Sequence, residues 1–378
     1  MKVLIAPDKF KDALTQSQAA DALATGVRRA RPDATPLCCP LADGGEGSAD
    51  AIAAALDARR QVASVADPLG RQHAAAWYHH PSRALAIVEM AAASGLRCLA
   101  PAERDPLRTT SYGTGELLHA ALAAGCGHIL LCVGGSATVD GGAGCLQALG
   151  WQFLDARGQR ITRAITGGLL ETVAEIGPPP LLPSAVIEVL CDVDNPLLGP
   201  RGAAPVFGPQ KGASAAAVAQ LERGLAHWAD VLQRCCGRDV RSVPHGGAAG
   251  GLPAGLAAAL GARLQSGFDT IARYVDLPGK LAGAQLCLTG EGCIDEQTIG
   301  GKVVAGVARL AREAGVPTVA FAGMVRLPPG QTLTELAAAI GLEEIVVISP
   351  PNLSGAEARR RAYEYLSAAA ERVVAARG

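Results

Sequence analysis

The sequence has little of what several classes of protein require. Aromatic residues make up only 3% of the 378 residues, and 34 basic side chains are balanced by 35 acidic ones, which leaves a formal net charge of −1. Proteins that bind nucleic acids or anionic membranes depend on an excess of lysine and arginine, and base-stacking surfaces depend on aromatic rings. The composition therefore argues against a nucleic-acid partner and against a basic membrane-surface protein.

Long hydrophobic runs and paired cysteines are also missing. The longest stretch without Asp, Glu, Lys or Arg covers residues 117–139, and its two histidines and four glycines predict a helix, a turn at 125–127 and a strand. The eleven cysteines include two adjacent pairs but no C-x-x-C, a spacing typical of zinc ribbons. We expect no targeting segment, reduced cysteines and a cytoplasmic location.

The best-known nucleotide-binding and kinase motifs are absent as well. The sequence contains no G-x-x-x-x-G-K-[ST] and no G-x-G-x-x-G at the start of a helix. The catalytic-loop and D-F-G motifs of protein kinases are missing too. The sequence is therefore not that of a P-loop enzyme, and it lacks the fingerprint of a dinucleotide-binding protein and the signatures of a protein kinase.

What the sequence does contain is a regular alternation of short apolar runs and amphipathic segments. Nearly continuous apolar runs are typical of strands covered on both faces, as in mostly parallel sheets. Thr15 with Gln18, and Ser354 with Glu357, match the capping box and predict the starts of the first and last helices. We therefore predict an α/β fold with mostly parallel sheets, whose strands include residues 3–5, 86–88, 129–133, 186–190, 286–288, 319–321 and 345–348.

The pattern near the C-terminus resembles that of the N-terminus, whereas the segment that begins at Asp67 is richer in glycine. This similarity favours one discontinuous, Rossmann-like α/β domain of residues 1–66 and 285–378. Residues 67–284 would then form a second α/β domain inserted into the first.

Four glycine-rich loops that carry carboxylates are the candidate sites of chemistry, at residues 42–47, 134–142, 191–196 and 289–295. Glycine lets backbone N–H groups approach a phosphate closely, and Asp and Glu supply the oxygen ligands that Mg²⁺ prefers. Four of the six lysines, Lys9, Lys11, Lys211 and Lys302, lie near such motifs. Turns and helix caps explain such a loop in general about as well as a ligand does. In residues 42–47 and 289–292, however, a carboxylate between glycines caps no evident helix, which favours a functional role. Together the loops offer the groups that phosphoryl transfer needs.

Taken in order, these motifs resemble those of the bacterial-type glycerate kinase family, and the resemblance covers essentially the whole chain. It rests on residues 5–11 (IAPDKFK), 42–47 (ADGGEG), 67–71 (DPLGR), 109–116 (TTSYGTGE), 134–138 (GGSAT), 191–196 (CDVDNP), 206–212 (VFGPQKG) and 289–292 (TGEG). The resemblance implies two α/β domains with mostly parallel sheets, one of them discontinuous, and an active site in the interdomain cleft. It also implies an enzyme that uses ATP and Mg²⁺ to phosphorylate D-glycerate, usually to 2-phosphoglycerate.

The resemblance suggests roles for individual residues. The catalytic candidates are Asp43, Asp192, Glu291 and Asp295, with Asp43 and Asp192 as alternatives for the base. The candidate ligands of Mg²⁺ are Asp192, Asp194, Glu291 and Asp295. Substrate or phosphate binding is expected of Lys9, Lys11, Arg71, Gly44, Gly45, Glu46, Gly134, Gly135, Ser136, Thr138, Lys211, Gly290, Gly292, Gln297 and Lys302.

Three positions depart from the family pattern. Val139 stands where the family commonly has Asn, Cys293 where it has Arg or Lys, and Pro253 where it has Gly. A kinase for another short hydroxy acid and a non-catalytic small-acid sensor remain alternatives, as does 3-phosphoglycerate as the product. The expected partner is the small-molecule substrate D-glycerate, with a homo-oligomer as a further option.

Overall fold

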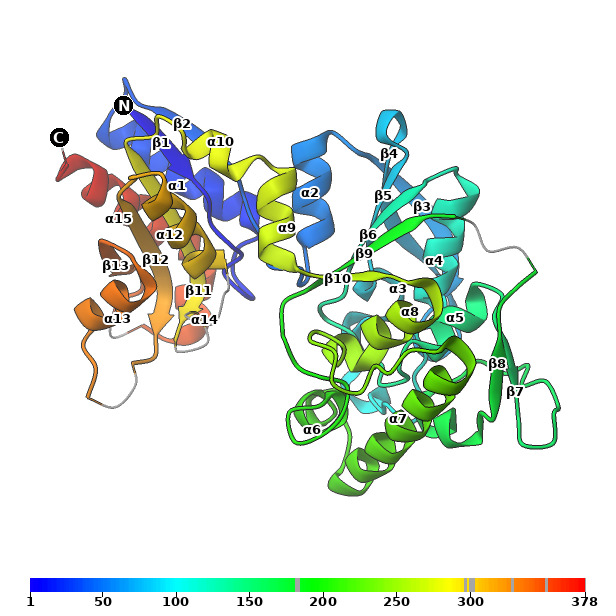
Figure 1. Ribbon diagram of the computed structural model, residues 1–378. Helices are drawn as coiled ribbons and strands as arrows, with labels where there is room; N and C mark the ends of the chain where they lie inside the picture. Colours follow the sequence, from blue (N-terminus) through cyan, green and yellow to red (C-terminus); the bar gives the residue numbers. More distant parts are fainter. Residues whose placement is uncertain (181–183, 296–297, 299–302, 328–329, 351–352, 378) are drawn as a thin grey trace. The chain divides into compact units, whose positions relative to one another are not determined.

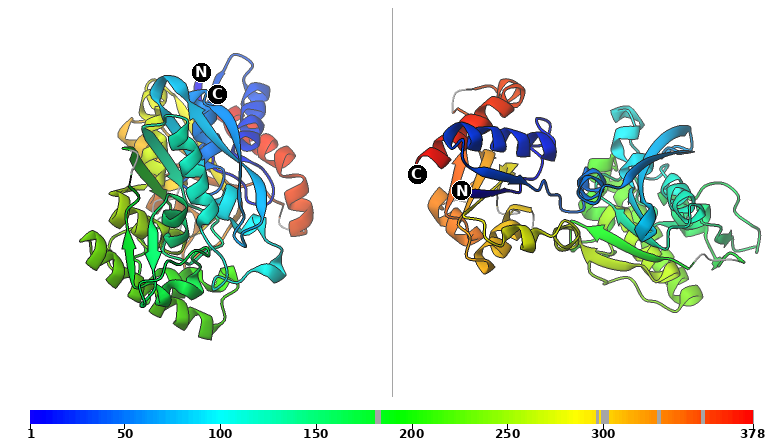
Figure 2. Two further views of the ribbon diagram at one scale, coloured as in Figure 1. Left: turned by 90° about the vertical axis from the view of Figure 1, so that its right-hand side faces the viewer. Right: turned by 90° about the horizontal axis from the view of Figure 1, so that it is seen from above.

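The computed structural model describes residues 1–180, 184–295, 298, 303–327, 330–350 and 353–377 (Figure 1). The chain forms two compact units. Unit 1 comprises residues 1–43, 50–55 and 268–378, and unit 2 comprises residues 44–49 and 56–267. Both chain ends therefore lie in unit 1 (Figure 2). The predicted domains, residues 1–66 with 285–378 and residues 67–284, remain a prediction about which parts of the chain fold independently.

Unit 1 is built on a five-stranded sheet in which every pair of neighbouring strands is parallel. Its strand order is β13–β12–β11–β1–β2. The strands are β1 (Lys2–Ile5), β2 (Thr35–Cys38), β11 (Leu286–Ile294), β12 (Thr318–Val325) and β13 (Glu344–Val347).

Helices cover both faces of this sheet, which explains why its strands are apolar on both sides (Figure 1). On one face, α1 (Gln16–Ala30) packs closely against α15 (Ala362–Ala375), because Gly26 leaves room for the backbone of Ser367. On the other face lie α12 (Val303–Glu313) and α13 (Leu333–Ile340). The remaining helices with residues in this unit are α2 (Ser48–Leu56), α9 (Gly267–Tyr274), α10 (Leu277–Leu281) and α14 (Gly355–Arg360).

Unit 2 contains a six-stranded mixed sheet in the order β10–β9–β6–β5–β4–β3. The strands β10, β9, β6 and β5 are parallel to one another. At the other edge, β4 is antiparallel to β5, and β3 is antiparallel to β4. The strands are β3 (Arg59–Ala66), β4 (Gln72–His80), β5 (Leu85–Glu89), β6 (His128–Cys132), β9 (Val186–Cys191) and β10 (Arg263–Ser266). A separate antiparallel pair is formed by β7 (Gln152–Leu154) and β8 (Glu175–Gly177).

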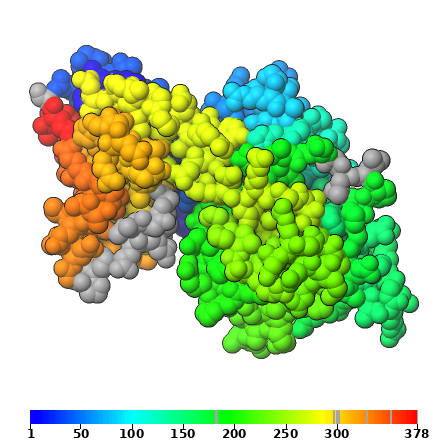
Figure 3. Space-filling view, viewed as in Figure 1, coloured from blue at the N-terminus to red at the C-terminus, as the bar shows by residue number. Residues whose placement is uncertain are grey.

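The core of unit 2 is organised around the longest helix, α7 (Ala215–Cys236). Its Trp228 is fully buried, stacks on Phe153 at 5.7 Å between ring centroids, and donates a hydrogen bond from Nε1 to the Gly141 carbonyl at 2.9 Å. In the view of Figure 3, α7 and α8 (green and yellow-green) form much of the surface of this unit. The other α-helices are α3 (Ala91–Ser94), α4 (Tyr112–Ala123), α5 (Ala143–Ala148), α6 (Ala203–Phe207) and α8 (Leu252–Leu260). Short 3₁₀ helices cover Pro81–Arg83, Leu96–Cys98, Pro101–Glu103, Gly167–Thr172, Pro209–Lys211 and Ala248–Gly251.

The structure confirms the predicted fold class, α/β with mostly parallel sheets, and all seven predicted strands. The capping box at Thr15 is also confirmed, because Thr15 Oγ1 accepts a hydrogen bond from Gln18 N at 3.2 Å. Ser354 caps a helix as predicted, but that helix, α14, ends at Arg360 and α15 follows it. The prediction that Ser354 starts the last helix of the chain was therefore wrong. None of the described helices is long and apolar enough to cross a membrane.

Candidate active site

In unit 1, the candidate site begins where β1 ends beside β11. The backbone continues alongside β11 after β1, with Ala6 N donating to Leu288 O at 2.8 Å and Asp8 N donating to Gly290 O at 2.9 Å. The side chains of Asp8 and Glu291 are both buried at this edge of the sheet. Asp8 follows β1, and Glu291 lies in the C-terminal half of the neighbouring parallel strand β11. Ligands bind at the carboxyl ends of the strands in open α/β sheets.

Asp8 has an unusual electrostatic environment. Burial and the nearby charge of Asp43 raise the pKa of Asp8 to about 8, and Glu291 adds to this effect. A hydrogen bond from Lys9 N to Asp8 Oδ1 at 2.7 Å opposes the shift without cancelling it. Asp8 was not among the predicted site residues, although it is the first polar residue after the first strand and could have been identified on that ground.

A threonine connects two of the predicted site residues of this unit, Glu291 and Asp295. Thr298 Oγ1 donates a hydrogen bond to Glu291 Oε1 at 2.8 Å and accepts one from Asp295 N at 3.2 Å. The fully buried Thr298 therefore holds the Glu291 carboxylate next to the backbone of Asp295, a role that the sequence analysis missed. Gln297 and Lys302, also predicted to bind substrate, lie outside the described residues.

The expectation that the strand ends before Thr289 was wrong, because β11 continues to Ile294. The two glycines in this part have steric reasons to be glycine. A Cβ on Gly290 would lie 2.4 Å from Phe321 O, and one on Gly292 would lie 2.9 Å from Lys11 N. The absence of side chains thus lets β12 and the backbone of Lys11 approach β11. Lys9 is half-buried and Lys11 is exposed.

In unit 2, two predicted glycine loops are in contact with each other. Gly134 N donates to Gly44 O at 3.3 Å, and a Cβ on Gly134 would lie 2.4 Å from the Cα of Gly45. Gly44 has a φ of +97°, a conformation that favours glycine. Close packing between the loops therefore explains the glycines without a ligand.

The first N–H groups of α2 are already hydrogen-bonded. Glu89 Oε2 accepts hydrogen bonds from Gly47 N at 2.9 Å and from Ala49 N at 3.3 Å, and Glu46 forms an ion pair with Arg97. A phosphate at this helix start would have to compete with the Glu89 carboxylate.

The second loop of unit 2 is held by a buried lysine. Lys211 is only 2% exposed, and its Nζ donates to Ser136 Oγ at 2.6 Å and to Thr138 O at 2.7 Å. Burial lowers the pKa of Lys211 to about 7, and the negative charge of Asp140 opposes this shift. In this structure the predicted phosphate-binding lysine thus contacts the loop itself.

Asp140 joins the same loop to two helices. Its carboxylate is fully buried and accepts hydrogen bonds from Ser111 N and Oγ (2.7 and 2.8 Å), from Gly142 N (3.2 Å) and from Gly144 N (3.3 Å). Burial raises the pKa of Asp140, and these hydrogen bonds only partly oppose the shift. The contacts are those of an anchor between the N-termini of α4 and α5.

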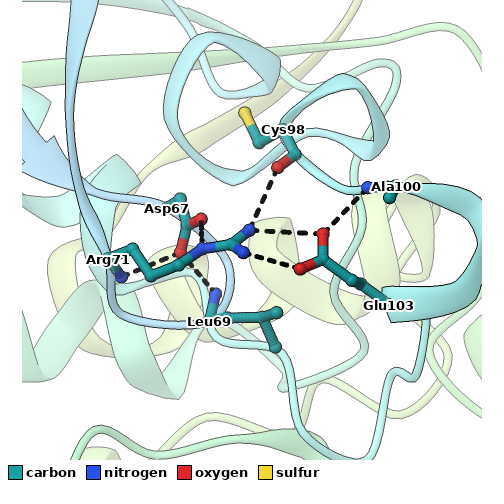
Figure 4. Close-up of polar contacts among 6 residues, drawn as sticks. All are labelled: Asp67, Leu69, Arg71, Cys98, Ala100 and Glu103. Atoms are coloured by element: carbon teal, nitrogen blue, oxygen red, sulfur yellow. Dashed lines mark hydrogen bonds and ion pairs between the residues drawn. The ribbon is translucent and has the colours of Figure 1, made fainter.

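Arg71 lies between two carboxylates (Figure 4). Its Nε is 2.5 Å from Asp67 Oδ2 and its Nη1 is 2.6 Å from Glu103 Oε1, while Asp67 Oδ1 accepts from the N–H groups of Leu69 and Arg71. Burial raises the pKa of Asp67, but the hydrogen bonds from Arg71 and Leu69 outweigh it and leave the pKa below its ordinary value. Two negative charges around one guanidinium make a poor binding site for a further carboxylate.

The predicted magnesium ligands are divided between the units. Glu291 and Asp295 belong to unit 1, whereas Asp192 and Asp194 belong to unit 2 and are exposed. Asp194 forms an ion pair with Arg201 at 2.9 Å. Within the described part of the chain, no three His, Cys, Asp or Glu side chains are grouped as a metal site. A magnesium ion that takes most of its ligands from substrate phosphates and water needs only one or two carboxylates.

The three departures from the family pattern have structural explanations in part. Val139 is fully buried in the core of unit 2, so a polar contact at this position is replaced by packing. Pro253 lies in the first turn of α8, where a missing N–H costs nothing. Cys293 is half-buried on β11, paired with Met324 of β12.

Comparisons with known proteins agree with this architecture. The model of the glycerate kinase family matches residues 3–377. The chain is 45% identical over 326 residues to the glycerate 2-kinase of Escherichia coli K12, and 44% identical over 324 residues to a glycerate kinase of Halalkalibacterium halodurans, with 85% of each chain covered in both cases. A crystal structure from Salmonella typhimurium LT2, of a protein assigned as glycerate kinase 2, superposes with a TM-score of 0.85 at 42% identity, covering 100% of this chain and 98% of that one.

Together, the family match over nearly the whole chain, the identities and the shared fold lead to one conclusion. The chain is an enzyme that belongs to the glycerate kinase family.

Proposed function

We propose that the protein transfers the γ-phosphoryl group of ATP, with Mg²⁺, to the 2-hydroxyl group of D-glycerate, which yields ADP and 2-phosphoglycerate. The family membership and the name of the E. coli relative, glycerate 2-kinase, support this choice of substrate and position. A kinase for another short hydroxy acid is the alternative to be tested.

The observation that carries the proposal is the pair of buried carboxylates formed by Asp8, after β1, and Glu291, on β11. A general base works best when its pKa lies close to the pH at which the enzyme operates. Asp8, whose pKa is raised to about 8 by burial and by Asp43, meets this condition. We assign Asp8 as the base, with Asp43 beside it, in place of the two bases that the sequence suggested, Asp43 and Asp192.

In the proposed reaction, the 2-hydroxyl oxygen of glycerate attacks the γ-phosphorus of ATP. A bond forms between these two atoms, the bond from the γ-phosphorus to the bridging oxygen breaks, and ADP leaves. The hydroxyl proton passes to the carboxylate of Asp8. Lys11, which is exposed, and the half-buried Lys9 are the cations of unit 1 that we propose for the glycerate carboxylate.

The remaining predicted residues keep proposed roles of two kinds. Mg²⁺ neutralises phosphate charge when it is bound, and the carboxylates that would hold it are those of Glu291 and Asp295, with Asp192 as a further candidate. The hard oxygen donors of Glu291 and Asp295 fit that ion, and a hydrogen bond from Thr298 already holds the Glu291 carboxylate. The loops with Gly44–Glu46 and Gly134–Thr138 would bind phosphate oxygens through N–H and hydroxyl groups.

A substrate comparison tests the proposal. ADP release would be measured with ATP and Mg²⁺ for D-glycerate, L-glycerate, hydroxypyruvate and erythronate at equal concentrations. We expect D-glycerate to give the highest kcat/KM, by about tenfold or more, since a site built for a substrate hydroxyl discriminates strongly against analogues that misplace it. A higher kcat/KM with erythronate or hydroxypyruvate would replace D-glycerate as the substrate.

A further inference from the structure

We propose that Lys211 is a positioning residue that orients the hydroxyl group of Ser136 as a hydrogen-bond donor to a phosphate group of ATP. The inference rests on the proposed function for the identity of the anion. It concerns how the loop of residues 134–138 (the GGSAT loop) is prepared to bind that anion.

The contacts of Lys211 Nζ decide the orientation of the Ser136 hydroxyl. A protonated lysine has three N–H donors and no acceptor, so Ser136 Oγ, 2.6 Å away, must accept the hydrogen bond. The hydrogen of the hydroxyl then points to another group. Since a hydrogen bond from a cation polarises the hydroxyl, that group gains a stronger donor than an ordinary serine would provide.

The rest of the GGSAT loop is held through hydrogen bonds to its backbone. Leu96 N donates to Gly135 O at 2.9 Å, Ala137 N donates to Ser94 O at 2.9 Å, and Thr109 Oγ1 donates to Ala137 O at 2.8 Å. Lys211 adds a further attachment, because its Nζ also donates to Thr138 O at 2.7 Å. The loop is thus fixed at four consecutive residues, and Ser136 is held through its side chain.

The lysine is itself held rigidly. Lys211 N donates to Gly208 O at 3.0 Å, and Gly212, with a φ of +96°, lies so close to Arg104 that a Cβ would be 2.1 Å from the Arg104 carbonyl oxygen. Burial lowers the pKa of Lys211 to about 7, and the negative charge of Asp140 opposes this shift. Below that pH the ammonium form, which can only donate to Ser136 Oγ, is the main form of this buried side chain.

The hydroxyl group of Thr138, on the same loop, can still form a hydrogen bond. Thr138 Oγ1 is buried, and it has no hydrogen-bond partner among the groups that the structure describes. Buried hydroxyl groups in folded proteins normally have a partner, so an unpaired one indicates a bound molecule or water. This observation is independent of the lysine contacts and points to the same loop.

A double-mutant cycle on nucleotide binding tests the inference. The dissociation constant of Mg·ATP would be measured by calorimetry, without glycerate, for the wild type, Lys211→Met, Ser136→Ala and the double variant. We expect Lys211→Met to weaken binding about tenfold or more and Ser136→Ala about fivefold. The double variant should bind within twofold of Lys211→Met, because removing the serine has no further effect once its orientation is lost.

Lys280→Met is the matched control, since Lys280 Nζ also donates to a backbone carbonyl, that of Val275, in the other unit. Its dissociation constant should equal that of the wild type. Independent effects that multiply in the double variant, or unchanged binding in Ser136→Ala, would overturn the inference. If Lys211→Met does not fold, the Ser136→Ala result alone decides. A wild type that binds Mg·ATP but does not phosphorylate glycerate would reject the proposed function and leave this cycle valid.

Discussion

Replacing Asp8 by Asn should make the protein more stable and much less active, because the charge that we assign to catalysis is unfavourable in the folded state. Asp8 is 7% exposed, and its pKa rises from 3.8 to about 8 on folding. The folded state therefore binds more protons than the unfolded state between about pH 4 and pH 8. Consequently, the contribution of Asp8 to the free energy of unfolding becomes less favourable as the pH rises through this window, and it is constant above the window.

The size of the effect follows from the same pKa. At 1.36 kcal/mol per pKa unit, the shift sets an upper limit on the order of 5 kcal/mol above pH 8. Relaxation and the effective dielectric of protein interiors reduce this limit, and we expect a gain of about 2 kcal/mol for Asp8→Asn. For a unit of this size, such a gain raises Tm by about 4–8 °C. Loss of a general base should lower kcat about 10²-fold or more.

The assay is thermal unfolding of wild type and Asp8→Asn at pH 4.5, 6.5 and 8.5, with steady-state kinetics at pH 7.5. The difference in Tm should be small at pH 4.5 and largest at pH 8.5. Asp33→Asn, an exposed aspartate in the same unit, is the control and should show no such trend. The reasoning is refuted if Asp8→Asn is less stable than the wild type at pH 8.5, or if the difference does not depend on pH.

Three further predictions concern separate parts of the molecule. Glu291→Gln should keep Tm within a few degrees, since its bond from Thr298 can be retained, while kcat falls about 10²-fold; near-normal turnover would return Glu291 to a structural role. Arg71→Met should change the KM for glycerate less than about twofold, because Asp67 and Glu103 already neutralise this arginine, and a rise above tenfold would show that it binds substrate. Burial raises the pKa of Cys287 to about 12, so iodoacetamide at pH 8 should label Cys287 at least about tenfold more slowly than the exposed Cys38, as mass spectrometry can check; equal rates would contradict its burial.

The strands of the parallel sheets could be predicted because their signal is local. An apolar run such as that of β12 is required wherever both faces of a strand are covered by helices. The antiparallel strands β3 and β4 were missed, since their residues alternate weakly and include several exposed side chains. The end of β11 was misplaced because the glycines of Thr-Gly-Glu-Gly are typical of a loop, whereas here they allow close contact with β12 and Lys11.

The sequence allowed us to predict which types of residue form the candidate site, but not which of them lie close together or are buried. That Asp8, Asp43 and Glu291 share one electrostatic environment depends on the pairing of β1 with β11, which joins residues nearly 300 positions apart in the sequence. The burial of Lys211 could not be predicted either, because a lysine in a glycine-rich segment is normally exposed. Only the tertiary contacts distinguish the side chains that we propose for catalysis from those that hold the loops in place; the sequence motifs do not.

The central claim is that the 2-hydroxyl group of D-glycerate receives the phosphoryl group of ATP. Phosphorus and proton NMR of the product formed by the wild-type protein from D-glycerate, ATP and Mg²⁺ tests it most directly. If the phosphoryl group is transferred to the 2-hydroxyl group, the product gives a phosphorus signal coupled to the proton on C2, together with one equivalent of ADP. Coupling to the protons on C3, or ADP without any phosphorylated glycerate, would contradict it.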